Sequence, residues 1–435
     1  MSLFTDITTA LENPRTTAVI LQSELEPAGG PGAVLAPPTY AADTDGPMAK
    51  FAYTPAAPVP AADEAGWFHD VERTDQGEPR QAPRVVINSL AAEAGACETN
   101  LYHQQGRLGV ALPAFVVGGD LGAPERVEAF LASSKTAREL TSEFARDQLR
   151  DALTTVVSSW EMAHRQADAW IRYAEQDGNQ LWKGEGGTKQ LIQSIGVKDG
   201  ATTFRHSPNS AVYGAWLSSG TPVRQAIPRA YASEITGYGV SPVYRSNTKL
   251  DAEGGASAVS RVQLKGGELA TASGKGGKAP SNLGFGQVPG RNHVAGFTCE
   301  RVLRQATISV KALRRFRYAG EQAEAQSLAA TRVYVLLAMA GHLLSGEDLF
   351  LRSGCDLVDV ADQWGWRRHG ERRPLQMDVP TVDQVAAALH EALDAAAAVG
   401  LSFADPIQLS LSTPEMELIA ERMAAEAKDE TPEGD

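Results

Sequence analysis

The stretch that decides the fold spans residues 304–344, RQATISVKALRRFRYAGEQAEAQSLAATRVYVLLAMAGHLL. From Ala306 to Val310 every second side chain is apolar, a period of two that predicts a strand over 304–312 with one buried face. Residues 323–344 instead carry apolar side chains every three or four positions, which predicts a long helix that packs on a core. A strand followed by a buried helix therefore forms the centre of the expected fold.

Strand and helix patterns continue on both sides of this pair. Residues 17–25 (TAVILQSEL) and 349–360 (LFLRSGCDLVDV) predict strands. Residues 84–87 (RVVI) are largely apolar, and Asn88 or Ser89 is placed to cap a helix that begins there. Further patterns predict strands at 110–118, 211–218 and 406–411, and helices at 381–399 and 413–427.

Without its insertions, the expected order of elements is strand, helix, strand, strand, helix, strand. This order is typical of ferredoxin-like and RNA-recognition folds, so we expect an α+β protein with a ferredoxin-like/RRM-like core. A single domain is expected over residues 1–435. Its expected insertions and tail are a Pro/Gly-rich loop at 27–83, a helical lobe at 121–190, a basic Gly-rich arm at 240–292 and a disordered acidic tail at 428–435.

Charge is distributed unevenly along the chain, whose formal net charge is −13. Between residues 200 and 320, sixteen Lys and Arg residues face five Asp and Glu residues, so this block carries +11 and the rest of the chain carries −24. Tyr, Trp and Phe residues are interleaved with these cations. Phosphates attract cations and bases stack on rings, so the block favours a groove for single-stranded nucleic acid. A solvated basic face with its rings in the core fits the composition equally well.

Several classes of protein are disfavoured by the sequence. The three cysteines are far apart and form no CxxC pair, which fits a reducing cytoplasm and neither a disulfide framework nor a zinc site. The first residues, MSLFTDITTALENPR, lack the apolar run of a secretion signal. The longest apolar run, near 333–344, is too short to span a bilayer. We therefore expect a cytoplasmic protein without a membrane partner.

No catalytic constellation stands out either. Residues 265–290 are rich in Gly and Lys but do not match the phosphate-binding pattern G-x4-GK[ST]. His69 and Asp70 form a lone HD pair, and no HExxH or GxSxG pattern occurs. Trp364 and Trp366 fit a stacking patch or a packed loop. We expect no enzyme activity, no cofactor and no metal.

Six segments, spread in order over most of the chain, carry a family resemblance. They are VVINSLAAEAGACETNLY at 85–102, LGAPERVEAFL at 121–131, FRHSPNSAVYGAWLSSG at 204–220, PRAYASEITGYGVSPVYRSNTKLD at 228–251, NLGFGQVPG at 282–290 and GEDLFLRSGCDL at 346–357. With these segments the chain resembles the Cas-seven-type backbone (RAMP) subunit of type I-U/I-G CRISPR Cascade complexes. In that family the fourth segment corresponds to a helix and a basic turn.

The resemblance implies a non-catalytic protein that binds CRISPR guide RNA for antiviral defence. Several copies would line up along one guide, with palm, fingers and thumb, and the exposed spacer bases would pair with target DNA. The implied partners are further copies of itself, other Cascade subunits and the recruited helicase-nuclease. The candidate RNA-binding residues are Asn88, Ser89, Arg224, Arg229, Arg245, Lys249, Arg261, Lys265, Lys275, Lys278, Arg291 and His293.

Three alternatives stay open. The first is a metal-dependent backbone subunit that cleaves target RNA, as in type III complexes, with Asp120 or Asp251 as a candidate carboxylate. The second is a structural assembly protein that binds no nucleic acid. A third concerns the run Arg314, Arg315 and Arg317, which fits an interface between subunits as well as an RNA groove.

Overall fold

A computed structural model describes residues 2–41, 46, 48–121, 125–140, 142–183, 186–217, 225–244, 262–265, 268–271, 277 and 294–430, and among residues 426–430 the backbone only. The chain forms two compact units. Unit 1 comprises Met1–Val117, Val157–Ser241 and Gly296–Leu409, and unit 2 comprises Gly118–Val156, Pro242–Ala295 and Ser410–Asp435.

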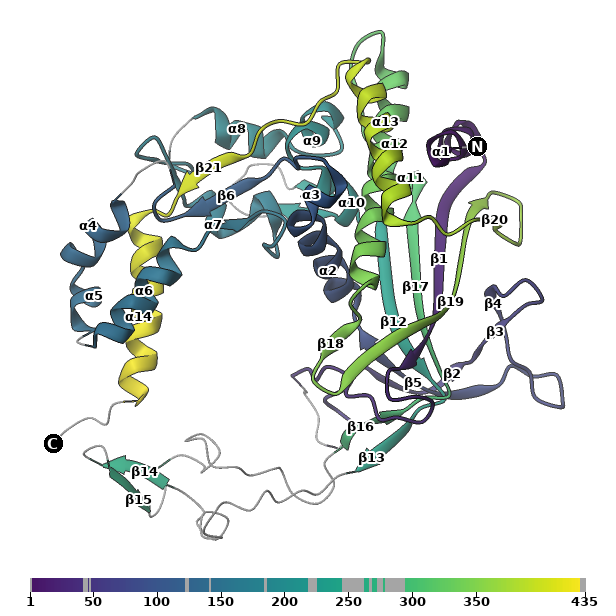
Figure 1. The fold of residues 1–435 in the computed structure, drawn as a ribbon, viewed down its shortest axis with the longest axis horizontal. Coiled ribbons are helices and arrows are strands. Elements are labelled where there is room, and N and C mark those ends of the chain that lie inside the picture. Colours follow the sequence, from purple (N-terminus) through teal and green to yellow (C-terminus); the bar gives the residue numbers. More distant parts are fainter. Residues whose placement is uncertain are drawn as a thin grey trace. The chain divides into compact units, whose positions relative to one another are not determined.

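A large antiparallel sheet forms the core of unit 1 (Figure 1). In spatial order its strands are β18 (Phe350–Arg352), β19 (Cys355–Arg368), β1 (Thr16–Pro27), β17 (Arg301–Ser309), β12 (Tyr231–Tyr238), β5 (Gln81–Asn88) and β2 (Tyr53–Pro58), with β20 (Leu375–Met377) paired to β19. The strands predicted at 17–25, 84–87 and 304–312 are thus confirmed as β1, β5 and β17, and the one at 349–360 divides between β18 and β19.

The order of four central strands identifies the core. Along the chain they run β1, α2 (Leu90–His103), β12, β17, α12 (Ala323–Gly346), β19. In space β19 lies beside β1, β1 beside β17 and β17 beside β12, all antiparallel. This is the fourth-first-third-second arrangement of a ferredoxin-like fold, which confirms the predicted α+β class. β5 and β2 extend the sheet beyond β12.

Two predicted elements are wrong, and the second strand of the core, β12, is not among the predicted strands. Residues 231–238, which the family resemblance assigned to a helix, form β12, because Tyr231, Ser233 and Ile235 are buried and alternate with half-buried neighbours. The strand predicted at 211–218 is divided between α10 (Pro208–Tyr213) and β10 (Ala215–Leu217). All residues of α10 are buried, so its sequence shows no helical period.

Helices cover one face of the sheet. α2 packs against β12, and α12 packs against both α2 and α13 (Val382–Ala397). α1 (Leu3–Glu12) lies against α12 and α13, while α11 (Val310–Leu313) joins β17 to this layer. Among the described residues α12 alone is long and apolar enough to cross a membrane, yet 78% of its most apolar window is buried inside the protein, as in the core helix of a globular fold. The helix predicted at 323–344 is confirmed.

The opposite face is partly covered by the segment predicted as a loop at 27–83. Besides β2 this segment holds the short ribbon β3 (Pro60–Ala62) and β4 (Phe68–Val71), so it is not irregular throughout. Trp67 is 2% exposed, and Val59 packs with Tyr238 and Leu303 of the sheet. The ribbon therefore buries apolar side chains on this face.

A second sheet has the order β7 (Val157–Ser158), β6 (Phe115–Gly118), β21 (Ile407–Ser410), β8 (Glu175–Gln176) and β9 (Asn179–Gln180). Around it lie the short elements of residues 105–227. They are α3 (Gln105–Leu108), η1 (Arg165–Ala167), α7 (Ala169–Arg172), α8 (Gly187–Ser194), α9 (Gly200–His206), α10, and the hairpin of β10 with β11 (Gln225–Ile227).

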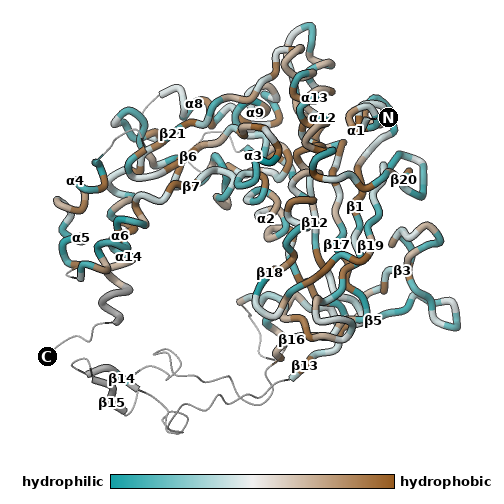
Figure 2. The backbone as a smooth tube through the Cα atoms, in the orientation of Figure 1, coloured by the Kyte–Doolittle hydropathy of each residue, from teal (hydrophilic) through white to brown (hydrophobic). Residues whose placement is uncertain are grey.

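Unit 2 contains four described helices, α4 (Arg126–Ser133), α5 (Lys135–Glu139), α6 (Glu143–Thr154) and α14 (Thr413–Glu430). α14 packs on α5 and α6, and Glu417 accepts hydrogen bonds from Ser134 at 2.8 Å and Thr136 at 2.7 Å. In Figure 2 the tube of α5 and α6 is largely teal, the colour of hydrophilic residues. The predicted lobe at 121–190 is therefore shared, because residues 157–190 belong to unit 1.

The predicted arm at 240–292 is described only in part. β13 (Ser241–Tyr244) pairs with β16 (Val294–Thr298), and the boundary between the units falls within both strands. Inside the arm, β14 (Val262–Lys265) and β15 (Glu268–Thr271) form an antiparallel hairpin. The predicted tail at 428–435 lies outside the described residues from 431 onward, and α14 continues to Glu430.

Candidate nucleic-acid interface

A buried ion pair joins the sheet to its helical layer. Arg304 of β17 is 2% exposed, and its Nε donates to Glu93 of α2 over 2.8 Å. Its two other nitrogens donate to Ser345 and to the His342 carbonyl of α12. Although burial disfavours the charge, the Glu93 carboxylate holds the pKa of Arg304 above its ordinary value. This cation of the basic block is therefore part of the core.

A chain of uncharged groups extends from this pair. Cys97 donates to the Tyr231 hydroxyl, which lies 2.8 Å from Nδ1 of His342. Burial lowers the pKa of His342 well below its ordinary value, and burial raises the pKa of Tyr231 well above its own. The imidazole is thus neutral and shares a hydrogen bond with the Tyr231 hydroxyl. No group in this chain is available to a ligand, because all three residues are buried.

Asn88 is built into the same network. Its side chain is 5% exposed, its amide donates to Glu93 over 2.6 Å, and its Oδ1 accepts from Arg352. The Asn88 side chain is therefore a core group, and a contact of its backbone amide with a phosphate stays a prediction. Ser89 caps α2 by accepting from the Ala92 amide, which confirms the predicted start of this helix.

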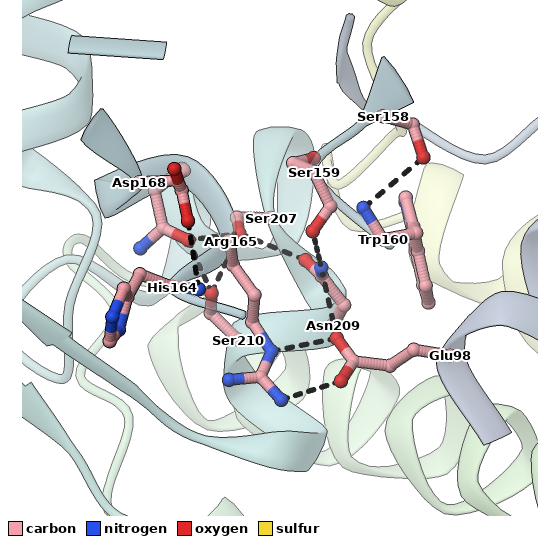
Figure 3. Close-up of polar contacts among 11 residues, drawn as sticks. Glu98, Ser158, Ser159, Trp160, His164, Arg165, Asp168, Ser207, Asn209 and Ser210 are labelled. Carbon is pink, nitrogen blue, oxygen red and sulfur yellow. Dashed lines mark hydrogen bonds and ion pairs between the residues drawn. The ribbon is translucent and has the colours of Figure 1, made fainter. Parts of the chain in front are cut away.

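A second buried network fixes the segment from 158 to 168 (Figure 3). Arg165, whose φ is +52°, donates two hydrogen bonds to Glu98 of α2, over 2.7 and 2.5 Å. Asn209 of α10 donates to Glu98 and to the Ser159 carbonyl. Burial raises the pKa of Glu98 to about 7, and Arg165, Asn209 and Arg229 oppose that rise. α2, η1 and α10 are tied together through this single carboxyl group.

Hydroxyl groups complete the second network. Ser207 and Ser210 both donate to the Gln166 side-chain oxygen, over 3.0 and 2.6 Å. Asp168 caps α7 by accepting from the Trp170 amide, and it also accepts from the His164 amide. The polar side chains of residues 158–168 thus hold the start of α7 rigidly on the body of unit 1.

The basic block divides into core and surface residues. Of its sixteen cations, eight have described side chains. Arg301 binds Glu24, Glu72 and the Pro60 carbonyl, Arg304 binds Glu93, and Arg314 donates to the carbonyls of residues 11, 13 and 16. The five that are exposed are Arg205, Arg229, Lys311, Arg315 and Arg317. The surface charge of the block is therefore smaller than its composition implies.

Among the predicted RNA-binding residues, Ser89 and Arg229 are described on the surface of unit 1. Ser89 is half-buried, and Arg229 is exposed close enough to Glu98 to lower its pKa. Lys265 ends β14, and its side chain is not described. Outside the described residues lie Arg224, Arg245, Lys249, Arg261, Lys275, Lys278, Arg291 and His293, together with Asp251 of the cleavage alternative.

Other side chains singled out in the sequence have structural roles. Trp364 and Trp366 are 1% and 4% exposed within β19, so they pack rather than form a stacking patch. His69 lies 3.5 Å from Asp63 rather than beside further metal ligands. Asp120 accepts from the Val127 amide at the start of α4. In the part of the chain that the structure describes, no three His, Cys, Asp or Glu residues gather closely enough to hold a metal ion.

Comparison with known protein families shows that the chain matches the family of CRISPR-associated protein GSU0053 over residues 19–242. The matched range is just over half of the chain, and it runs from β1 through β12. No curated protein matches the chain. The family match agrees with the resemblance carried by the segments between 85 and 251. The chain belongs to the family of CRISPR-associated protein GSU0053, a Cas-seven-type family.

Proposed function

We propose that this chain is a non-catalytic backbone subunit that binds CRISPR guide RNA. Several copies line up along one guide in a cytoplasmic Cascade complex and present its spacer bases to target DNA. Other Cascade subunits and a recruited helicase-nuclease complete the antiviral machinery. The observation that supports this role best is the gathering of +11 into residues 200–320 of a chain that is otherwise strongly acidic.

The described part of this charge is available to a polyanion. Lys311 lies on α11, and Arg315 and Arg317 follow it within one short segment. The Arg317 amide donates to the Val197 carbonyl, and its own carbonyl accepts from the Gly200 amide, which brings exposed Lys198 beside this segment. No described residue forms an ion pair with Lys198, Lys311, Arg315 or Arg317. Their charge is therefore directed to solvent or to a phosphate backbone.

A charge-removal variant tests this role. Lys311, Arg315 and Arg317 are replaced together by Ala in the full chain, and affinity for a short single-stranded RNA is measured from 50 to 200 mM salt. Each phosphate contact contributes about −0.7 to the slope of log affinity against log salt, so three lost contacts make the slope shallower by about 2. The matched control replaces Lys135, Arg138 and Arg146, exposed cations of unit 2, and keeps the slope.

Two outcomes overturn the assignment. If both triple variants bind RNA with the same affinity and slope, the cations of α11 do not contact the guide. If RNA affinity is unchanged while self-association along the guide is lost, they form an interface between copies. The wider proposal is tested on the protein purified together with its partner subunits, by measuring the ratio of absorbance at 260 and 280 nm. A ratio typical of protein alone contradicts bound RNA.

The absence of catalysis needs its own test. The assembled complex is incubated with RNA that matches the guide in the presence of Mg²⁺, and the products are separated by size. We expect intact RNA. Regularly spaced fragments would contradict a non-catalytic subunit and would support the metal-dependent alternative, in which a loop carboxylate such as Asp251 holds the ion.

A further inference from the structure

Large aromatic rings are exposed on unit 1 outside the basic block. Trp170 of α7 is 38% exposed, and Tyr173, which ends this helix, is 45% exposed. Trp182 follows β9 and is half-buried. Such rings are usually buried or used for binding. Three of them in one segment therefore indicate a binding surface.

Cations lie directly against these rings. The Arg172 guanidinium carbon is 5.6 Å from the centroid of Tyr173 and also 5.6 Å from that of Trp182. The Lys189 ammonium is 5.9 Å from the Trp182 centroid, and it donates to the Trp182 carbonyl over 3.2 Å. We call Trp170, Arg172, Tyr173, Trp182 and Lys189 the ring cluster. Its positive charges and π-faces are presented together.

A tight turn brings the two halves of the ring cluster together. Asp177 and Gly178 have φ values of +51° and +76°, as a two-residue type I′ hairpin requires. The turn pairs β8 with β9 and returns the chain, so that the Leu181 amide donates to the Ala174 carbonyl over 2.9 Å. Trp182 is thereby placed beside Arg172.

The α7 half of the ring cluster is anchored in the core. Ile171 and Ala174, which alternate with its exposed members, are both 0% exposed and anchor α7 in the core. The buried network of Figure 3 fixes the preceding residues, since Asp168 caps α7 and Arg165 is bound to Glu98. A platform that is ordered before its ligand arrives loses little conformational entropy on binding.

We propose that the ring cluster is a stacking platform for single-stranded nucleic acid. Bases stack on Trp170 and Tyr173, and Arg172 and Lys189 lie near the phosphates. The inference rests on the proposed function because it requires that the chain binds nucleic acid. It does not require that the chain is a backbone subunit. A guide RNA and a single-stranded stretch of target DNA offer the same chemistry, so the test includes both.

Charge distinguishes this platform from the basic block. Between residues 169 and 190 the cations Arg172, Lys183 and Lys189 are balanced by the carboxylates Glu175, Asp177 and Glu185, so the local net charge is zero. Stacking must therefore supply most of the binding, at roughly 5- to 150-fold in affinity per base. Loss of stacking lowers affinity at every salt concentration and leaves the salt slope unchanged.

The test uses the full chain with labelled oligouridine and oligothymidine. The variant Trp170→Ala/Tyr173→Ala is compared with Trp170→Phe/Tyr173→Phe, which keeps both rings. Phe144→Ala, which removes a 71% exposed ring from α6 of unit 2, is the control. We expect the alanine variant to lose at least about fivefold in affinity at 50 and at 200 mM salt, with an unchanged slope, and the other two to bind like the unchanged chain.

The outcomes separate this inference from the proposed function. If the unchanged chain binds oligonucleotide and the alanine variant binds equally well, the ring cluster is not a stacking platform, although the proposed function stands. If that variant instead loses self-association, the cluster is a protein interface. Loss of binding to oligouridine alone, or to oligothymidine alone, supports the platform and identifies its strand. If the unchanged chain binds neither oligonucleotide, both proposals are overturned.

Discussion

At the scale of single residues, the buried charge of Arg304 is what the core depends on. The guanidinium and the Glu93 carboxylate are each 2% exposed and lie 2.8 Å apart. Asn88 and Ser233 donate to the same carboxylate, so it is fully enclosed by protein partners. Removal of one partner from such a pair leaves an uncompensated charge in a medium of low dielectric constant.

We therefore predict that Arg304→Met lowers the free energy of unfolding by about 3–5 kcal/mol, measured by urea denaturation. Methionine keeps much of the volume of arginine, so the loss reports charge rather than a cavity. The control is the double variant Glu93→Gln/Arg304→Met, in which both charges are gone. It should be more stable than the single variant. Equal or greater instability of the double variant would show that packing, and not the ion pair, sets the cost.

At the scale of elements, α2 and α12 pack closely through a glycine. A Cβ atom at Gly341 of α12 would collide with the Tyr213 hydroxyl and would lie 3.0 Å from Leu101 and 3.2 Å from Cys97 of α2. All three neighbours are buried side chains that cannot move aside into solvent. The glycine is thus a packing requirement of the helical layer.

Gly341→Ala is expected to lower the free energy of unfolding by about 1–3 kcal/mol, because it overpacks this contact. Gly95 of α2 provides a matched control. It is exposed in the middle of the helix and a Cβ there meets nothing within 4 Å, so Gly95→Ala should stabilise by about 0.5–1 kcal/mol through helix propensity. Thermal denaturation of both variants checks the pair. Shifts of the same sign would refute the close contact.

Which elements could be predicted depends on how they are buried. β17 shows its period of two, and α12 is long enough to be recognised from its apolar repeat. α10 is buried on all sides, so no period distinguishes it from a strand. β12 alternates in burial as a strand does, whereas the family resemblance predicts a helix for these residues. In these elements the surroundings of each residue, rather than its type, determine whether it forms a helix or a strand.

The candidate surface was harder to predict than the fold. Counting charges cannot reveal that Arg301 and Arg304 are neutralised by carboxylates far away in sequence. The ring cluster was missed because its members are spread over residues 170–189. The Asp177-Gly178 pair was the one local signal, since this dipeptide favours the type I′ turn that folds Trp182 back.

At the scale of the whole molecule, charge and fold are separated along the chain. Every strand of the large sheet comes from residues outside 242–295, and unit 1 excludes that range. The range nevertheless carries seven of the sixteen cations of the basic block, from Arg245 to Arg291. The sheet can therefore form without the predicted arm, while nucleic-acid binding is expected to depend on it.

Deletion of residues 252–281, with a short Gly-Ser linker in their place, tests this separation. The deletion removes Arg261, Lys265, Lys275 and Lys278, so four lost phosphate contacts would make the salt slope of RNA binding shallower by about 3. A full-length variant with these four residues changed to Gln is the control, and it should reproduce the shallower slope. Thermal unfolding should stay cooperative in both, because β12 and β17 keep their register with β1 and β5. If the deletion abolishes cooperative unfolding, residues 252–281 belong to the core and the predicted bounds of the arm are wrong. If the deletion variant binds RNA with an unchanged slope, these cations do not contact the guide.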